Sequence, residues 1–325
     1  MIRSLITGCG GYLPGNPVSN DALAARYGLE TSDNWIVERT GIRQRHIADA
    51  DVTASDLGTM AARLAMESAS VTAEEVDAII VATATPDSAF PATAVRIQQK
   101  LGVTRGFAFD LAAACAGFIY ALGVADAMIR TGQARCVLVI GTEVYSRILD
   151  WSDRGTCVLF GDGAGAVVLR ADAGRGTTSD RGILSTHLHA DGRHGDILLV
   201  EGGAGSTGGP GVLRMAGREV FRHAVQKLAG VVDEALAANG LGHGDVNWLV
   251  PHQANIRIIE AVGKKLNLPP EQVVVTVDRH ANTSAASIPL ALNEAWRDGR
   301  IRPGDLVLME AIGGGLTWGA ALARI

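Results

Sequence analysis

The chain has 325 residues, of which 47% are hydrophobic and 19% charged, and its formal net charge is −5. This apolar content is enough for a large core and excludes a disordered protein, and the acidic balance argues against a general nucleic-acid binder. The length is about twice that of a usual domain, so we expect two domains or one duplicated unit.

The cysteines and the hydropathy pattern indicate a cytoplasmic, non-membrane protein. No two cysteines form a CxxC pair, which favours reduced thiols. The longest uncharged run, residues 111–125, has fifteen residues, fewer than the ~18 that a membrane span needs. The start of the chain also lacks the long apolar stretch of a signal peptide. The four cysteines are Cys9, Cys115, Cys136 and Cys157.

Short β-rich runs alternate with helical stretches in the first half, a pattern typical of α/β proteins with largely parallel sheets. The helix expected at residues 116–130 is apolar on nearly every face, so it belongs between two layers rather than on a surface. A second helix is expected at residues 56–70. Strands are expected at residues 4–7, 78–83, 106–110, 136–141 and 164–170.

The second half repeats this scheme. Cys115 lies 21 residues before the strand that starts at Cys136, and Asn282 lies 23 residues before the one that starts at Asp305. We therefore predict an α/β protein of two similar halves, residues 1–172 and 173–325, that join in a polar, glycine-rich stretch at 171–181. Two sheets with two apolar helices between them give a five-layered αβαβα fold. In this half the expected helix is 283–297, and the expected strands are 247–250, 273–277, 305–310 and 318–323.

Two segments resemble cofactor-binding or metal-binding motifs. Residues 203–208 match GxGxxG after a strand-like run at 197–200, but Gly-Pro-Gly follows at 209–211. That tripeptide cannot open the helix that a dinucleotide site needs, so we predict a flexible loop. His187, His189 and His194 form no helical i,i+4 pair, so we expect a surface loop and no metal site there.

Cys115 follows an expected strand and begins the first apolar helix. The partial positive charge of a helix N-terminus favours a thiolate, and the small neighbours at residues 112–117 leave room for an acyl group. A core cysteine at a tight turn is the alternative interpretation. His252 follows another strand, Asn282 precedes the second apolar helix, and a glycine turn spans 311–319. Since strand ends converge in such folds, these segments supply a thiol nucleophile, two hydrogen-bond donors and an oxyanion site.

With these segments the sequence resembles the β-ketoacyl-acyl carrier protein synthase III family of the thiolase superfamily, essentially from end to end. Further matches are DNWIVERTGIR at 33–43, RGT at 154–156, FGDGAG at 160–165 and GGGLTWG at 313–319. The resemblance implies a homodimer that initiates type II fatty-acid synthesis. An acyl-CoA, with acetyl-CoA favoured, acylates Cys115, and malonyl-acyl carrier protein then condenses with loss of carbon dioxide. No metal or redox cofactor is expected.

The resemblance also assigns roles to residues. Neutral His252 and the Asn282 amide are expected to donate hydrogen bonds to the enolate oxygen, and the N–H groups of Cys115 and Gly314 to form the oxyanion hole. Phe90 is expected to reach across the dimer and close the partner's acyl pocket, which Phe160 narrows and Ile312 widens. The residues expected to bind CoA are Trp35 and Arg154 at the adenine, Arg39 and Thr40 nearby, and Gly217 and Asn255 along the pantetheine tunnel.

Basic residues flank the tunnel positions and predict a docking surface for the acidic carrier protein. A solvated helix face is the alternative. One cluster is Arg214, Arg218, Arg222 and Lys227, and the other is Arg257, Lys264 and Lys265. Two other functions stay open: a starter-unit ketosynthase or acyltransferase of natural-product biosynthesis, and a non-catalytic acyl-carrier binding module. The Cys–His–Asn set argues against the second.

Overall fold

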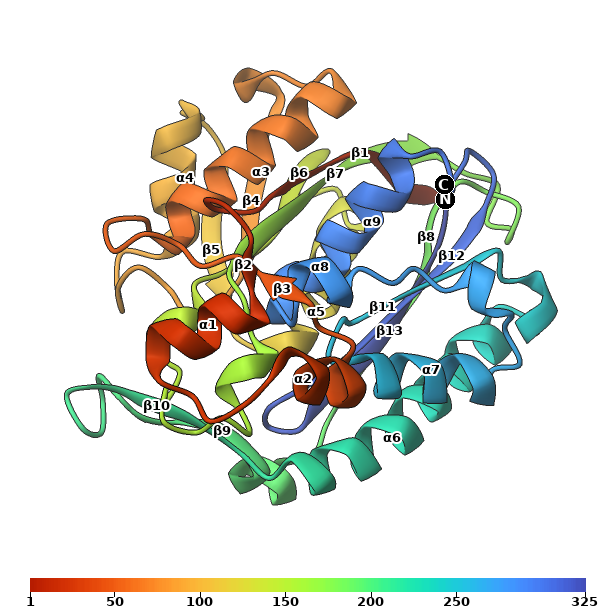
Figure 1. The fold of residues 1–325 in the computed structure, drawn as a ribbon. Helices are drawn as coiled ribbons and strands as arrows, with labels where there is room; N and C mark the ends of the chain where they lie inside the picture. The colour runs from red at the N-terminus through yellow and green to blue at the C-terminus, as the bar shows by residue number, and fades with distance from the viewer.

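The computed structural model describes residues 1–325, with the side chain of Pro210 excepted. Figure 1 shows two sheets with a layer of helices between them and further helices on their outer faces. The predicted five-layered αβαβα arrangement is confirmed.

The first sheet has five strands. β4 (Ala78–Ala82) lies between β5 (Phe107–Leu111) and β6 (Cys136–Glu143) and runs parallel to both. β7 (Gly163–Ala173) joins β6 to β1 (Ile2–Tyr12), antiparallel to each. The helices α3 (Ala54–Ala69) and α4 (Thr93–Leu101) cover the outer face. α3 lies so close to β1 that a Cβ on Gly10 would stand 2.3 Å from the Ala61 carbonyl oxygen, so only glycine fits there.

The second sheet has four strands in the order β11 (Trp248–Pro251), β12 (Leu306–Gly313), β13 (Thr317–Arg324) and β8 (Gly182–Ala190). Only β11 and β12 are parallel. The long helix α6 (Gly217–Ala238) packs on this sheet and on α7 (Ile256–Lys265). β13 runs antiparallel to β12, which places the glycine turn at 314–316 beside the end of β12.

The middle layer consists of α5 (Gly117–Arg130) and α9 (Ser287–Arg297). α5 contacts strands of both sheets, and its Phe118, Ile119 and Leu122 are completely buried. This confirms that the apolar helix predicted at 116–130 lies between two layers. The second predicted helix starts at Ser287 instead of residue 283, because Ser284 has a φ of 50° that an α-helix does not accept.

Smaller elements complete the fold. The short strands β2 (Val18–Ser19) and β3 (Gln44–Arg45) pair with each other, and β9 (Leu198–Gly203) and β10 (Gly209–Met215) form a hairpin. The GxGxxG segment is the turn of that hairpin, which confirms the predicted loop. The remaining α-helices are α1 (Asn20–Tyr27), α2 (Asp33–Thr40) and α8 (Val277–His280).

Two predictions about local structure were wrong. The strand expected at 273–277 is a single bridge between Val273 and Leu249, because the Gln253 side chain binds the N–H groups of Thr276 and Val277 and turns the chain into α8. The histidines at 187 and 189 lie in β8 and not in a loop. Their spacing of two puts both rings on one face, where they contact the Glu234 carboxylate at 3.0 and 2.6 Å.

β1, β4, β5, β6 and β7 form the first sheet, and the pair β2–β3 is a separate small sheet. β8 begins the second half at Gly182. The boundary at residues 172 and 173 stays a prediction. All four cysteines are buried and free, in agreement with the expected reduced thiols. Among the helices that the structure describes, none combines the length and the hydropathy that a bilayer crossing needs.

Candidate active site

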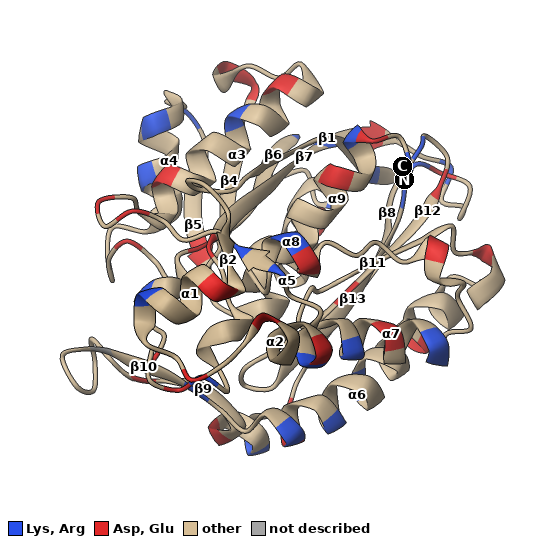
Figure 2. Cartoon of the chain, in the orientation of Figure 1, with Lys and Arg blue, Asp and Glu red and all other residues tan. Residues whose placement is uncertain are grey.

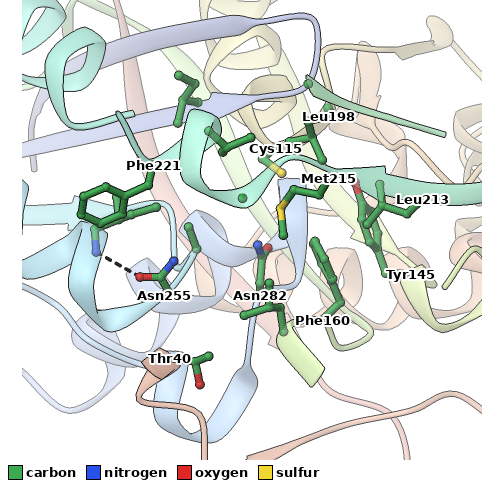
Figure 3. Close-up of a pocket in the computed structure, with 18 of the residues that line it drawn as sticks. Thr40, Cys115, Tyr145, Phe160, Leu198, Leu213, Met215, Phe221, Asn255 and Asn282 are labelled. Atoms are coloured by element: carbon green, nitrogen blue, oxygen red, sulfur yellow. Dashed lines mark hydrogen bonds between the residues drawn. The ribbon is translucent and has the colours of Figure 1, made fainter. Parts of the chain in front are cut away.

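One cavity of about 860 Å³ lies between the two halves and receives residues from both. Its walls include the three residues predicted to do the chemistry, Cys115, His252 and Asn282, together with Gly314 of the glycine turn. Figure 3 shows Cys115, Asn282 and Tyr145 facing this cavity. The topology therefore brings together segments that are up to 199 residues apart in the chain.

Cys115 sits in a tight turn between β5 and α5. Ala114 just before it has a φ of 45°, a left-handed conformation that few alanines adopt, and the 3₁₀ turn Ala114–Ala116 then leads into the helix. Burial raises the pKa of the Cys115 thiol to about 11. The sequence predicted that the helix N-terminus favours a thiolate. Burial acts in the opposite direction, because removing water from the sulfur disfavours its charged form.

His252 follows β11 and is held at two points. Its backbone N–H donates to the Glu310 carbonyl at 2.8 Å, and its Nδ1 lies 2.6 Å from the Ser287 hydroxyl at the start of α9. Burial lowers the pKa of His252 to about 3, so the ring is neutral near pH 7, as predicted. A neutral imidazole carries one N–H, and a Ser287 hydroxyl that donates to Nδ1 leaves the proton on Nε2.

Two backbone hydrogen bonds hold Asn282 in place. Its N–H donates to the Leu159 carbonyl at 2.9 Å, and its carbonyl accepts from the Gly161 N–H at 3.0 Å. In the side chain, Oδ1 accepts a hydrogen bond of 2.9 Å from the Ser284 N–H. The acceptor atom of the amide is therefore occupied, and Nδ2 remains as a donor, which is the role that the sequence predicted.

The glycine turn lies directly against the turn that carries Cys115. A Cβ on Gly313 would stand 2.6 Å from the Cys115 nitrogen, and one on Gly314 would stand 2.5 Å from the Leu198 carbonyl oxygen. Neither position can carry a side chain without moving backbone. Thr317 ties the two turns together through a hydrogen bond of 2.9 Å from its hydroxyl to the Ala113 carbonyl. The backbones that would form an oxyanion hole are thus held close to each other.

The cavity opens beside α2, where Trp35, Arg39 and Thr40 line it. The guanidinium groups of Arg39 and Arg154 lie 4.5 and 5.3 Å from the centre of the Trp35 ring. Arg154 therefore lies beside the predicted adenine site, although it does not line the cavity. An adenine between Arg154 and Trp35 would require the arginine to move outward. The Thr40 hydroxyl is occupied, because it donates to the Ile36 carbonyl and accepts from the Ile42 N–H.

Gly217 and Asn255, which were predicted to lie along a tunnel, both line the cavity. Asn255 caps α7, since its Oδ1 accepts from the Ile258 N–H at 3.1 Å, the bond drawn as a dashed line in Figure 3. Its amide Nδ2 is the atom available to a ligand. Gly217 begins α6.

Of the three predicted acyl-pocket residues, Phe160 and Ile312 line the cavity. Phe90 does not line it among the described residues of this chain, and its side chain is 85% exposed. Sequence reasoning missed the apolar wall that the β9–β10 hairpin supplies, and it missed Tyr145. The periodic apolar residues of that hairpin were the available signal: Leu198, Val200, Leu213 and Met215.

The predicted basic surface is formed by exposed residues of α6 and α7, which Figure 2 shows as blue bands along these helices. Arg257 lines the mouth of the cavity, whereas Arg222, Lys264 and Lys265 lie outside it. Within the described side chains these four form no ion pair. The charges of Arg214 and Lys227 are already partnered, because Arg214 pairs with Asp150 at 2.8 Å and Lys227 lies over the Trp318 ring.

Comparisons with known proteins agree on one family. Residues 109–192 match the family model for 3-oxoacyl-[acyl-carrier-protein] synthase III, and residues 236–325 match its C-terminal model. The chain is 67% identical over 324 residues to the β-ketoacyl-[acyl-carrier-protein] synthase III of Acidiphilium cryptum, with 100% of both chains covered.

Solved structures are similar over the whole chain. The 3-oxoacyl-[acyl-carrier-protein] synthase III of Aquifex aeolicus VF5 has a TM-score of 0.93 at 46% identity, covering 99% of this chain and 100% of that one. The priming β-ketosynthase of the R1128 polyketide pathway has a TM-score of 0.92 at 36% identity, covering 99% and 96%. Fold and relatives together define an acyltransferase of the thiolase superfamily. Within that superfamily, the chain belongs to the β-ketoacyl-[acyl-carrier-protein] synthase III family.

Proposed function

We propose that the protein condenses a short acyl-CoA, acetyl-CoA above all, with malonyl-acyl carrier protein and so initiates type II fatty-acid synthesis. One observation carries this proposal. Cys115, His252 and Asn282 line a single buried cavity whose mouth is lined by Trp35 and Arg39. The cavity thus combines a nucleophile, two neutral hydrogen-bond donors and an entrance suited to a nucleotide.

In the first half-reaction the Cys115 sulfur attacks the acyl-CoA carbonyl. The carbonyl oxygen becomes an oxyanion, which the backbone N–H groups of Cys115 and Gly314 would stabilise. The carbon–sulfur bond to CoA then breaks, and the acyl group stays on Cys115. The small residues around Cys115 and the glycines opposite leave the carbonyl room to become tetrahedral.

In the second half-reaction the malonyl thioester loses carbon dioxide and becomes an enolate. His252, with its proton on Nε2, and the Asn282 amide Nδ2 would donate to the enolate oxygen, and the enolate carbon would attack the acyl group on Cys115. The electron pair of the new carbon–carbon bond comes from the bond to the departing carboxylate. We therefore propose that the reaction requires no metal and no redox cofactor.

Mass spectrometry of the protein after incubation with acetyl-CoA tests the first step. We expect the mass of one acetyl group on the peptide that contains Cys115, and removal of that group when malonyl-acyl carrier protein is added. A protein that binds acetyl-CoA but never carries the acetyl group would contradict the acyl-enzyme.

We further propose that the active form is a homodimer. Strand β5 is the edge of the first sheet, so one side of its backbone lacks a strand partner within the chain. Phe107 at its start is 38% exposed, and Phe90 projects from the preceding connection. An unpaired edge flanked by exposed aromatic side chains is favourable for pairing with a second copy.

The acyl pocket gives a prediction about the primer. Phe90 is expected to close the pocket of the other protomer, so Phe90→Thr should increase the use of longer acyl-CoA primers relative to acetyl-CoA. In the unmutated enzyme we expect acetyl-CoA to be used first, butyryl-CoA weakly and dodecanoyl-CoA negligibly. An apolar pocket discriminates by only ~1–3 kcal/mol per methylene, so the preference should be graded. Competition assays with these three primers measure it, and equal turnover of acetyl- and dodecanoyl-CoA would contradict a short pocket.

The basic surface gives a prediction about the carrier protein. Arg222 and Lys264 are exposed and lie outside the cavity, so replacing both with Glu should raise the KM for malonyl-acyl carrier protein and leave acetylation of Cys115 by acetyl-CoA nearly unchanged. The difference from wild type should shrink with salt, since charges are screened within about 10 Å at 0.1 M. Arg63→Glu with Arg181→Glu is the matched control, because it makes the same change in charge on other exposed surfaces. Equal KM values for the two double variants at low salt would place the docking surface elsewhere.

A further inference from the structure

A buried serine contacts the ring of His252 from the start of α9. The hydroxyl oxygen of Ser287 lies 2.6 Å from the Nδ1 atom of His252, well within hydrogen-bond distance. Since His252 lines the cavity and its Nε2 has no hydrogen-bond partner within the described residues, Nε2 is the ring atom left for a substrate. The proposed reaction requires a proton on Nε2, so the direction of the bond to Ser287 decides whether His252 can act as a donor.

The second contact of the Ser287 hydroxyl fixes the direction of this bond. The backbone N–H of Gln253 donates to the Ser287 oxygen at 3.3 Å. Within the described residues, the hydroxyl has no polar partner besides this N–H and the Nδ1 atom of His252. An N–H group cannot accept a hydrogen bond, so Nδ1 is the acceptor for the hydroxyl proton. A proton on Nδ1 would leave the buried hydroxyl without an acceptor, which native structures avoid.

A serine in a helix often has another acceptor, which is the carbonyl of the residue four positions earlier. For Ser287 this residue is Thr283. The Thr283 carbonyl accepts a hydrogen bond of 3.0 Å from the Ala286 N–H, and the Ser287 hydroxyl bonds to His252 instead. The hydroxyl is therefore directed away from its own helix and toward the histidine.

The residue that supplies the N–H group is held firmly by its own side chain. Gln253 is completely buried. Its Nε2 donates to the carbonyls of Pro251 and Val274 at 2.9 and 3.0 Å. Its Oε1 accepts from the N–H groups of Thr276 and Val277 at 2.8 and 3.0 Å. All hydrogen-bonding positions of this amide are thus used, which keeps the backbone of Gln253 in place beside the start of α9.

The start of α9 is fixed as well, by close packing on the first sheet. A Cβ on Gly141 of β6 would stand 2.2 Å from the Ala285 carbonyl oxygen. One on Gly165 of β7 would stand 2.7 Å from the Leu290 nitrogen. Both strands therefore lie directly against the backbone around Ser287. The packing of the first sheet on α9 thus carries a hydroxyl to a histidine that follows a strand of the second sheet.

We propose that Ser287 is a positioning residue that holds neutral His252 in the tautomer with its proton on Nε2 and so directs that proton to the enolate oxygen. This inference rests on the proposed function, in which His252 donates to the enolate. Ser287 does not line the cavity, so it acts through His252. Burial lowers the pKa of His252 to about 3, so the ring has one proton to place on one of two nitrogens.

The first test measures the tautomer directly, by ¹⁵N NMR of the whole protein labelled at its histidines and without any substrate. The protonated and the unprotonated ring nitrogen of a neutral histidine have well-separated ¹⁵N shifts, and the spectrum of His252→Ala identifies the signals of His252. In the wild type we expect the proton on Nε2. In Ser287→Ala the two shifts should move toward each other, because both tautomers are then populated. A proton on Nδ1 in the wild type would overturn the proposal.

The second test compares the two half-reactions. Ser287→Ala should slow carbon dioxide release from malonyl-acyl carrier protein by about three- to tenfold, as loss of one neutral hydrogen bond does, and should slow acetylation of Cys115 less. Ser287→Thr keeps the hydroxyl and should restore both the rate and the wild-type shifts. Ser4→Ala is the matched control and should change neither, because it removes a buried hydroxyl outside the cavity whose hydrogen bond to Asp126 is 2.7 Å long.

The outcomes separate this proposal from the proposed function. If the wild type released no carbon dioxide from malonyl-acyl carrier protein, the proposed function would fail, and the NMR spectra would still decide the tautomer. If it releases carbon dioxide and Ser287→Ala keeps both the wild-type shifts and the wild-type rate, the positioning role is refuted and the function stands. Equal losses in both half-reactions with unchanged His252 shifts would indicate a general structural defect and would also overturn the proposal.

Discussion

Cys115→Ala should abolish acyl-enzyme formation and condensation to below detection. The variant removes the only atom in the proposed mechanism that bonds to the acyl group, and no neighbouring side chain can replace a sulfur at the end of that tight turn. Little else should change, because alanine fills most of the buried space and the turn is held by Thr317. Decarboxylation of malonyl-acyl carrier protein should persist, since His252 and Asn282 remain in place. Condensation and carbon dioxide release are both measured from the same incubation.

The control for this variant is Cys136→Ala, which removes a buried free thiol from β6. It should still be acetylated by acetyl-CoA. A covalent acetyl group on Cys115→Ala would show that another residue is the nucleophile.

His252→Ala and Asn282→Ala should each slow decarboxylation by about 10²-fold or more, as loss of one oxyanion donor does. Both side chains present a hydrogen-bond donor to the cavity because another residue occupies the other polar atom of each. The acceptor atom of Asn282 is bound by the Ser284 N–H, and the Nδ1 atom of His252 is paired with Ser287. The measurement is release of carbon dioxide from malonyl-acyl carrier protein at saturating concentration.

Acetylation of Cys115 serves as the internal control for these two variants. It should suffer less than decarboxylation in Asn282→Ala, because the oxyanion of that step lies at the backbone N–H groups of Cys115 and Gly314. Equal losses in both half-reactions would contradict the division of roles.

The fold was largely predictable because its hydrophobic pattern is strong. The run of β4 is completely buried, and α5 is apolar on nearly every face. Such segments are typical of layers that are covered on both sides. The strand expected at 273–277 failed for a reason that local sequence does not reveal. Its N–H groups are bound by the side chain of Gln253, more than twenty residues earlier in the chain.

That Cys115, His252 and Asn282 would meet in one cavity was predictable, because all three lie at strand or helix ends that converge in this fold. The rise in the pKa of Cys115 was not predictable, because it depends on how deeply the rest of the chain buries the sulfur. Met215 and other residues that line the cavity belong to the β9–β10 hairpin. No local sequence pattern gives the position of that hairpin.

Decarboxylative condensation on Cys115 is measured by the yield of 3-oxoacyl-acyl carrier protein per carbon dioxide released. Malonyl-acyl carrier protein would be supplied with acetyl-, butyryl- or dodecanoyl-CoA in turn. We expect one 3-oxoacyl product for each carbon dioxide, with acetyl-CoA the best primer. A preference for a long or unusual primer would favour a starter-unit enzyme such as the related priming ketosynthase. Wild-type protein that binds acyl carrier protein but forms no carbon–carbon bond with any primer would contradict the account.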